Sequence, residues 1–429
     1  MIFPTSVRAA SLACAIAAVV GAAAACTSGE AARPVANGTA TTAPATQSAT
    51  STPPDPPQSP TPGSSKPVDP ITLAPATPTA TPSSRIADPL PGMPVVDNAA
   101  NIYSHDLAGM LSPVVKGFPS LIYVPNSASN TVDVIDPATF AIVGHFAVPG
   151  QPQHVVPSYD LKTLWVNSDV GNALVPIDPA TGKPGPPVPV SDPYNLYFTP
   201  DGRFALVMAE RMRRIDWRDP HTMALIHTTN VPCKGVNHAD FSANGRYLIA
   251  SCEFDGRVLK VDTISQQVVA QMQLTPNAMP QDVKVSPDGK VFYIADMRSN
   301  GVWEIDGSTF SKIGFIPTGR GAHGLYVSRD ATVMYVTNRG EGSISLIDLA
   351  KRAVRTKWSI PGGGSPDMGG LSADGKELWV TGRYNGVVYD ISTVDGHLIK
   401  KIAVGSGPHG LCVYPQPGRY SLGHTGVFR

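Results

Sequence analysis

Tyr123-Val124-Pro125-Asn126, followed closely by Thr131-Val132-Asp133-Val134-Ile135-Asp136, predicts two β-strands joined by a turn. Both runs are rich in β-branched and aromatic residues, which favour strands. The first run recurs along the chain, with near-copies at Trp165-Val166-Asn167, Tyr293-Ile294-Ala295-Asp296, Tyr335-Val336-Thr337-Asn338 and Trp379-Val380-Thr381. The phrase is therefore the unit of an internal repeat.

The repeat has a nearly constant length. One strand residue marks each copy, at Tyr123, Trp165, Leu206, Ile249, Tyr293, Tyr335 and Trp379, and successive marks lie 41 to 44 residues apart. Seven β-rich copies of this length are typical of four-stranded propeller blades. We therefore predict an all-β fold, a seven-bladed β-propeller over residues 119–415 of the 429-residue chain.

Each copy also carries turn signals between its strands. Pro287-Asp288-Gly289 is one example, in which Gly supplies a positive φ and Asp can bond the local backbone. An acid ends the third strand of six copies, and Ser392 takes this place in the seventh. The six acids are Asp136, Asp178, Asp216, Asp262, Asp306 and Asp348. We expect them to cap turns rather than to act in catalysis.

The first copy lacks an opening strand, and a spare one lies at the other end of the chain. Residues 408–413 match residues 322–327. We therefore expect the C-terminal strand to close the ring by pairing with the first copy, which leaves no open sheet edge. Residues 96–118 should cover part of the ring as a short helix or an extended flap, and the tail 416–429 should pack beside them.

These copies resemble the YVTN-type β-propeller repeat, which is intact at Tyr335-Val336-Thr337-Asn338. The resemblance covers nearly all of the expected folded part. It implies the fold and leaves the activity open, because similar propellers occur in proteins of many functions. They include surface-layer proteins, electron-transfer domains of nitrous-oxide and haem d1 nitrite reductases, lactonases, a streptogramin lyase and an exported DNA-binding protein.

The N-terminal part indicates export. Residues 1–25 have the charged start and short apolar run of a signal peptide, and Ala23-Ala24-Ala25-Cys26 resembles a bacterial lipoprotein signal, with Ala23 where Leu is usual. Lipidation of Cys26 would anchor the protein to the cell membrane, and an ordinary secretory signal is the alternative. Residues 26–95 are rich in Ala, Thr, Ser and Pro, a composition typical of a disordered tether.

The candidate ligand site lies where the innermost strands begin, at the expected mouth of the central channel. Its residues are His154, Asn195, His238, Asp282, His323, Asp367 and His409. Imidazole and carboxylate groups are ligands of divalent metal ions. However, His154 and His238 come one position later in their copies than His323 and His409, and neighbouring strand residues point to opposite faces. The pattern therefore leaves convergence open; no cofactor is evident, and a divalent metal ion is the alternative.

Two of the five cysteines are expected to pair. Cys233 precedes an innermost strand and Cys252 ends the strand that returns beside it, so in an exported protein they predict a disulfide. A Cys/His metal site with His238 is the alternative. Cys412 is expected to be a buried apolar residue, and Cys14 leaves with the signal peptide.

Composition and motifs limit the function. Formal net charge is zero, so no nucleic-acid partner is expected. The sequence has no phosphate-binding loop, nucleophile elbow or CxxCH haem motif. The first hypothesis is an envelope-anchored binding scaffold with no evident catalytic motif, for an unknown envelope protein or small ligand; the motifs leave open whether the protein is an enzyme and favour a non-catalytic role. The alternative is an exported metal-binding protein or an enzyme of lyase, lactonase or redox type that uses the His/Asp ring.

Overall fold

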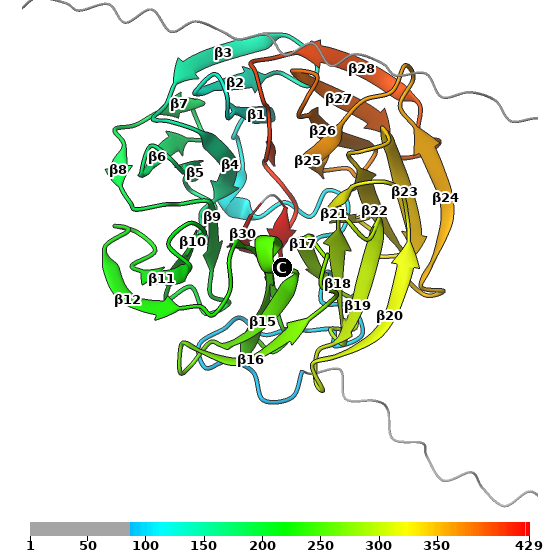
Figure 1. Ribbon diagram of the computed structural model, residues 1–429. Helices are drawn as coiled ribbons and strands as arrows, with labels where there is room; N and C mark the ends of the chain where they lie inside the picture. Colours follow the sequence, from blue (N-terminus) through cyan, green and yellow to red (C-terminus); the bar gives the residue numbers. More distant parts are fainter. Residues whose placement is uncertain (1–85, 425) are drawn as a thin grey trace, which may run out of the picture. The chain divides into compact units, whose positions relative to one another are not determined.

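The computed structural model describes residues 86–424 and 426–429, and within them the strands form seven antiparallel sheets around one axis (Figure 1). Each sheet is one propeller blade of four main strands, numbered from the axis outward. The predicted all-β, seven-bladed propeller is confirmed.

The blades follow one another in chain order. Blade 1 consists of β29 (Cys412–Tyr414), β1 (Leu121–Asn126), β2 (Thr131–Ile135) and β3 (Ile142–Ala147). Blade 2 consists of β4 (Pro152–Pro157), β5 (Leu164–Ser168), β6 (Ala173–Asp178), β7 (Lys183–Pro184) and β8 (Val188–Pro189). Blade 3 consists of β9 (Asn195–Phe198), β10 (Ala205–Ala209), β11 (Arg214–Arg218) and β12 (Leu225–Asn230), extended by β30 (Ser421–Gly423) and β31 (Val427–Phe428).

The remaining four blades are regular. Blade 4 consists of β13 (Val236–Phe241), β14 (Tyr247–Cys252), β15 (Arg257–Asp262) and β16 (Gln267–Gln273). Blade 5 consists of β17 (Pro280–Val285), β18 (Val291–Asp296), β19 (Gly301–Asp306) and β20 (Ser311–Pro317). Blade 6 consists of β21 (Ala322–Val327), β22 (Val333–Asn338), β23 (Ser343–Asp348) and β24 (Ala353–Ser359), and blade 7 of β25 (Pro366–Leu371), β26 (Glu377–Gly382), β27 (Val387–Ser392) and β28 (Leu398–Ala403).

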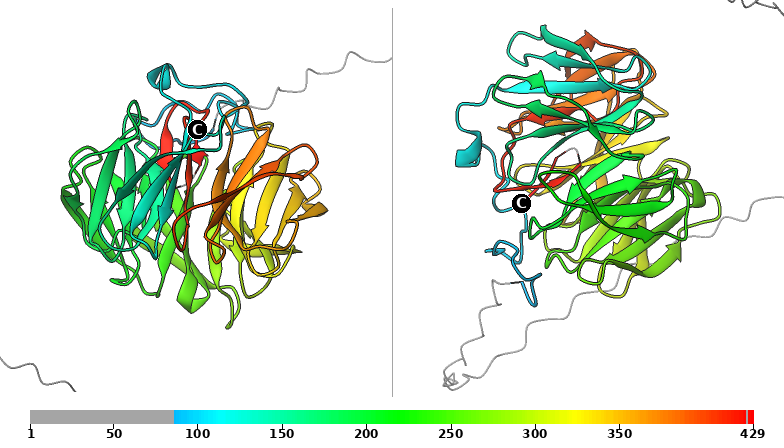
Figure 2. Two further views of the ribbon diagram at one scale, coloured as in Figure 1. Left: turned by 90° about the horizontal axis from the view of Figure 1, so that it is seen from above. Right: turned by 90° about the vertical axis from the view of Figure 1, so that its left-hand side faces the viewer.

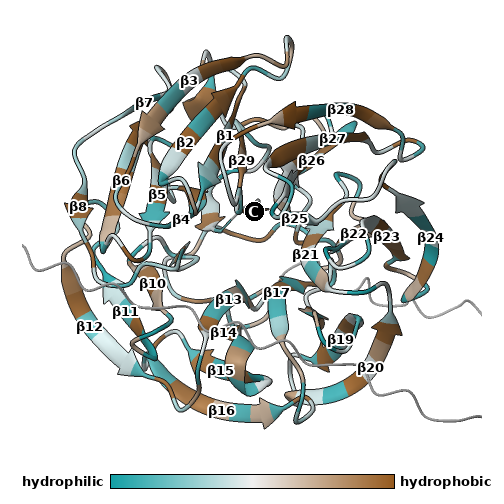
Figure 3. Ribbon diagram, turned by 45° about the horizontal axis from the view of Figure 1, so that its top comes forward, coloured by the Kyte–Doolittle hydropathy of each residue, from teal (hydrophilic) through white to brown (hydrophobic). Residues whose placement is uncertain are grey.

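Burial falls from the axis outward. The inner strand β17 is buried at every position, whereas the outer strand β16 alternates between exposed and half-buried residues. Figure 3 shows this alternation of hydropathy along β16 and β20. The apolar side chains that mark the repeat, such as Tyr123 and Trp379, pack between neighbouring blades. Stacking of blades therefore forms the core, as expected of a repeat fold.

The turns follow the chemistry read from the sequence. Gly289 has φ of +70°, and its N–H donates to Ser286 O over 2.8 Å. Five of the six predicted acids cap the turn after the third strand, as Asp306 does by accepting from the N–H groups of Ser308 and Thr309. The prediction was wrong for Asp216, which lies inside β11 and pairs with Arg214 and Arg218.

Asp219 caps the turn of blade 3 in place of Asp216. It accepts from the N–H groups of His221 and Thr222. Strand β11 runs to Arg218, so the turn comes later than the Ile-Asp pattern indicated.

The C-terminal strand closes the ring, as predicted. β29 pairs with β1 in antiparallel register, with Leu121 opposite Tyr414 and Tyr123 opposite Cys412. Blade 1 is thus built from both ends of the propeller sequence.

Residues 86–118 lie on the face where the innermost strands end, called here the strand-end face. Ile102 N donates to Pro287 O over 2.8 Å, and Tyr103 Oη donates to Val285 O over 2.7 Å. The segment is irregular, with a single short 3-10 helix η1 (Pro113–Val115) among its described residues. Its contacts begin before residue 96, because Leu90 is buried and bonds Asn244 O. Figure 2 shows this segment and the C-terminus on the same face.

The C-terminal tail lies beside residues 96–118, where Gly418 N donates to Met110 O over 3.1 Å, and its last strands also enter the ring. β30 pairs with β9 and with β31, so β30 and β31 form a hairpin beside the axis. Tyr420, Leu422, Val427 and Phe428 are all buried. The hairpin therefore enters the axis from the strand-end face, and within residues 86–118 and the described part of the tail no segment covers the opposite face, where the innermost strands begin.

Cys233 and Cys252 form the predicted disulfide, with their Cα atoms 6.0 Å apart, and Cys412 is a buried free thiol. A disulfide is typical of a protein exported from the reducing cytosol. Among the described residues, no helix has the length and hydropathy needed to span a bilayer. The expected signal peptide, the tether up to residue 85 and the lipidated Cys26 lie outside the described residues.

Candidate metal centre

The innermost strands carry a bulge at the positions that supply the candidate ligands. In blade 4, Val236 pairs with Cys252 but Ala239 pairs with Ala250, so one extra residue lies between them. The same register shift occurs at the start of the innermost strand in blades 2, 5, 6 and 7. A bulge breaks the strict alternation of side chains and re-aims those beside it. This is the reason why histidines one position apart in the repeat converge.

The structure brings all seven candidate residues to the axis. His154, Asn195, His238, Asp282 and Asp367 are fully buried, and His323 and His409 are exposed by 2% and 1%. The ring centroids of His154 and His409 are 4.8 Å apart, and those of His238 and His323 are 6.3 Å apart. Each of the seven blades thus contributes one of these residues to the cluster.

His424 joins the cluster from the C-terminal hairpin. Its ring lies 5.2 Å from that of His154 and 4.9 Å from that of His238, between centroids. One nitrogen from each of these three rings lies within 4.8 Å of the other two. His154, His238 and His424 are called here the imidazole triad.

The hydrogen bonds of His154 and His238 fix which nitrogen is available. His154 Nδ1 lies 3.0 Å from the carbonyl O of Tyr194, and His238 Nδ1 lies 3.0 Å from Asn237 Oδ1. Both partners are acceptors, so each Nδ1 carries the proton and each Nε2 keeps a lone pair. Both Nε2 atoms are buried and have no hydrogen-bond partner among the described residues. An orphaned buried acceptor is costly, and a metal ion would satisfy both.

The surroundings keep these rings neutral. Burial lowers the pKa of His154 and of His238 well below the usual imidazole value, and the neighbouring His424 lowers both further. A neutral imidazole is the form that binds metal, so the two rings need not lose a proton at neutral pH.

Asn195 and Asp282 position His424. Asn195 Nδ2 lies 3.0 Å from His424 Nδ1, and Asp282 Oδ1 lies 3.3 Å from His424 Nε2. Asp282 also accepts from the backbone N–H of Leu325 in the next blade over 3.0 Å. Both nitrogens of His424 are thus engaged: Nε2 donates to the Asp282 carboxylate, as metal-ligating histidines do to an outer partner, and Nδ1 accepts from the Asn195 amide.

His323, Asp367 and His409 form a second group of the same spacing, called here the aspartate cluster. Here His323 uses both nitrogens: Nδ1 lies 3.0 Å from Asp367 Oδ1, and Nε2 lies 3.3 Å from Arg339 Nη1. Burial alone would raise the pKa of Asp367, but Arg339 and the two imidazoles hold it well below its usual range. The aspartate cluster is therefore an ion-paired network and is less ready for a metal ion than the imidazole triad.

Sequence reasoning missed two parts of the site. One is His424, because no repeat register reaches the tail. The other is a ring formed by the residue that follows the second strand of every blade. Its members are Ser127, Asp169, Glu210, Glu253, Met297, Arg339 and Arg383. This position directly follows the YVTN-type strand, so aligning the copies one residue further could have found it.

Acid should destabilise the metal-free fold through His409. Burial is the largest cause that lowers the pKa of His409 well below its value in the unfolded chain, and the positive charge of Arg383 is the second. Asp367 raises this pKa, and the neighbouring His154 and His323 lower it. Because the unfolded chain binds more protons below pH about 6.5, the free energy of unfolding should fall by up to about 1.4 kcal/mol per pH unit from this group.

Urea unfolding at pH 7.5, 6.5 and 5.5 measures this effect. His409→Gln should flatten the decline between pH 6.5 and 5.5, and His397→Gln, at a ring that is 61% exposed, should not. Equal pH slopes in wild type and His409→Gln would contradict the expectation.

The comparisons with known proteins agree on the fold. A family model described as YNCE-like beta-propeller matches residues 100–418. The chain is 24% identical over 261 residues to 6-phosphogluconolactonase of Serratia proteamaculans (strain 568), which covers 53% of this chain and 77% of that protein. Hydrazine synthase of Kuenenia stuttgartiensis aligns with a TM-score of 0.57 and 19% identity, over 64% of this chain and 93% of that chain.

A further solved structure, the dihydro-heme d1 dehydrogenase NirN in complex with DHE, aligns with a TM-score of 0.52 and 15% identity, over 68% of this chain and 74% of that chain. The likenesses to solved structures show the fold alone. The family match covers all seven blades from β1 to β29. The chain therefore belongs to the YNCE-like beta-propeller family, in agreement with the YVTN-type repeat read from its sequence.

Proposed function

We propose that the protein is an exported metal-binding β-propeller, in which the imidazole triad holds one transition-metal ion. His154 and His238 would bind it through Nε2. His424 would be the third ligand through Nδ1, in exchange for the hydrogen bond that this nitrogen accepts from Asn195. The sequence suggested a binding scaffold first and a metal-binding protein second. The arrangement of the histidines at the axis favours the second.

One observation carries the proposal, namely the two orphaned Nε2 atoms with fixed tautomers. For His238 the fixing partner is itself held: Asn237 Nδ2 donates to Glu253 Oε2 over 2.7 Å. A chain of carboxylate, amide and imidazole orients the ring without help from a metal ion. Such outer-shell support is typical of metal-ligating histidines.

The ligand set limits the metal. Three imidazoles suit Zn²⁺, Cu²⁺ or Co²⁺, whereas Mg²⁺ and Ca²⁺ require oxygen ligands. Zn–N bonds of about 2.0–2.1 Å in a tetrahedral site place ligand nitrogens about 3.4 Å apart. Nitrogens within 4.8 Å of one another need only a small inward shift to reach that spacing. Three protein ligands would leave a position for water or a small molecule.

A metal titration tests the proposal. Metal-free full-length protein should bind one Zn²⁺ or Cu²⁺ per chain by isothermal titration calorimetry, and elemental analysis should find that ion after desalting. Mg²⁺ should produce no binding heat. If the folded protein retains none of the transition metals, the proposal is wrong and the scaffold function takes its place.

The localisation at the cell membrane is part of the same proposal. Lipidation of Cys26 would anchor the protein to the cell membrane, and the residues between Cys26 and the propeller would act as a tether. The disulfide supports export.

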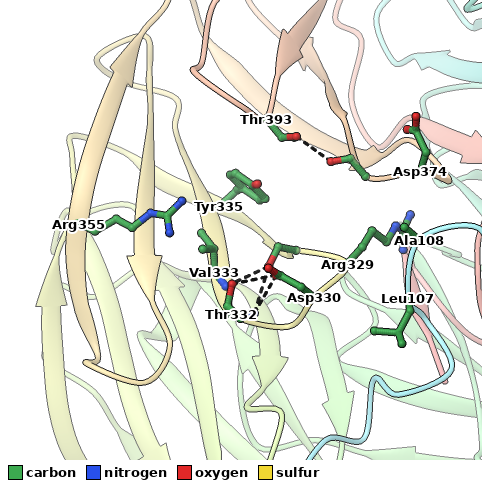
Figure 4. A pocket seen from close by; sticks show the side chains of 12 residues that line it. Leu107, Ala108, Arg329, Asp330, Thr332, Val333, Tyr335, Arg355, Asp374 and Thr393 are labelled. Atoms are coloured by element: carbon green, nitrogen blue, oxygen red, sulfur yellow. Dashed lines mark hydrogen bonds between the residues drawn. The ribbon is translucent and has the colours of Figure 1, made fainter.

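A binding scaffold is the second candidate function, and two grooves on the strand-end side favour it. One has a volume of about 560 Å³ and includes Leu107, Tyr335 and Thr393 (Figure 4). The other has a volume of about 740 Å³, and both are lined by Thr332 and Arg355. None of the residues that line these grooves belongs to the imidazole triad, so a partner bound there and a metal ion at the axis do not exclude one another.

A further inference from the structure

The ring of residues that follows the second strands is divided by charge. Asp169, Glu210 and Glu253 belong to blades 2, 3 and 4, which also hold the imidazole triad. Arg339 and Arg383 belong to blades 6 and 7, beside the aspartate cluster. The two halves of the ring therefore suit groups of opposite charge.

The two arginines converge on one carboxylate. Arg339 Nη1 lies 3.0 Å from Asp367 Oδ1, and Arg383 Nε lies 3.8 Å from Asp367 Oδ2. The side chains of Arg339 and Arg383 are 10% and 22% exposed. Two guanidinium groups against one carboxylate leave one positive charge between these three groups.

Several hydrogen-bonding atoms here remain unused. Arg383 Nη1, Arg339 Nε and His409 Nδ1 are buried and have no hydrogen-bond partner among the described residues. A guanidinium cannot lose its proton, so an orphaned N–H on it can be satisfied only by an acceptor. Net positive charge together with unused donors is the property of an anion site.

We propose that Arg339 and Arg383 form a subsite for a small oxyanion, either a carboxylate or a phosphate, at the entrance to the axis. Arg383 Nη1 would donate to one anion oxygen, and Arg339 Nε to the same oxygen or its neighbour. Guanidinium groups recognise carboxylate and phosphate through such paired N–H donors. The role of this subsite rests on the proposed metal function. It adds to that function the class of ligand, a small oxyanion that would bind next to the metal ion.

The subsite is close enough to act on the imidazole triad. Arg383 lies against Asp367, and His409 Nε2 is 3.6 Å from Asp367 Oδ2. The ring centroids of His409 and His154 are 4.8 Å apart. An anion beside Arg383 would therefore lie within electrostatic reach of a metal ion bound by His154. Its negative charge would in turn be stabilised by that ion.

Calorimetry with sodium phosphate and with sodium acetate tests the subsite, on metal-free full-length protein in Hepes buffer without chloride. Wild type should bind one anion per chain, and Arg383→Gln should weaken that binding at least tenfold. Arg383→Lys keeps the positive charge near Asp367 and therefore controls for a loss of folding in Arg383→Gln. It should bind the anion with intermediate affinity, because an ammonium group lacks the planar fork of a guanidinium. Arg203→Gln, at an exposed arginine in the turn between β9 and β10 that lines neither strand-end groove, should leave the affinity unchanged.

The outcomes separate the subsite from the metal site. Equal affinities in wild type and both Arg383 variants, or no binding heat from either anion at millimolar concentration in folded protein, would overturn the subsite. Anion binding without any uptake of Zn²⁺ or Cu²⁺ would retain the subsite and remove the metal function. Preference for phosphate over acetate, or the reverse, identifies which oxyanion the subsite takes.

Discussion

Replacing both His154 and His238 by alanine is expected to abolish stoichiometric metal binding. These residues supply the two orphaned Nε2 atoms of the imidazole triad. Apparent zinc-binding energies of about 10–16 kcal/mol for four-ligand sites correspond to about 3 kcal/mol per ligand. Loss of two ligands should therefore raise the dissociation constant by on the order of 10⁴-fold. Competition titration with a chromogenic chelator measures the change.

Two histidine variants serve as controls. His323→Gln alters a buried ring of the aspartate cluster whose two nitrogens are both engaged, so it should lower stability and retain the metal. His397→Ala alters an exposed ring in blade 7 and should change neither property. If His323→Gln loses the metal while the double variant keeps it, the aspartate cluster is the metal site and the assignment to the imidazole triad is wrong.

Deleting residues 406–429 is expected to prevent formation of the native ring. The deletion removes β29, whose pairing with β1 closes blade 1. It leaves β1 as an open inner edge and removes Leu411, Val413 and Tyr414 from the core. Because blades 1 and 7 then lose their shared packing, circular dichroism should show no cooperative thermal transition near that of wild type.

A shorter truncation after Pro417 separates closure from the hairpin. It keeps β29 and removes β30, β31 and His424. Its cost in unfolding free energy should be a few kcal/mol, since the ordering entropy of the released residues offsets much of the lost burial. It should fold and fail to bind metal tightly. Native stability in the longer deletion would contradict the closure argument.

Most of the fold could be predicted because its signals are local and repeated. The 41 to 44-residue spacing from Tyr123 to Trp379, together with turns such as Pro287-Asp288-Gly289, determined the number of blades. The register of the copies also predicted the closing strand and the disulfide between Cys233 and Cys252. Each inference needed only the residues within one copy and its match in another.

The candidate site could be predicted only as a set of residues. The repeat register identified His154, His238, His323 and His409, but strict alternation left their convergence undecided. The bulge that begins each of five innermost strands is visible only in the pairing of Val236 and Ala239 and their equivalents. His424 lies outside every copy.

The sequence by itself thus determined the seven-bladed ring, its closure and the ring of polar residues where the innermost strands begin. These features depend on turn chemistry and on a period, which are properties of neighbouring residues. Only the tertiary structure decided that His154 and His238 meet His424, and that Arg339 and Arg383 meet Asp367. The physical reason is that each of these groups joins side chains from different blades or from the tail, so their meeting depends on how the ring packs around its axis.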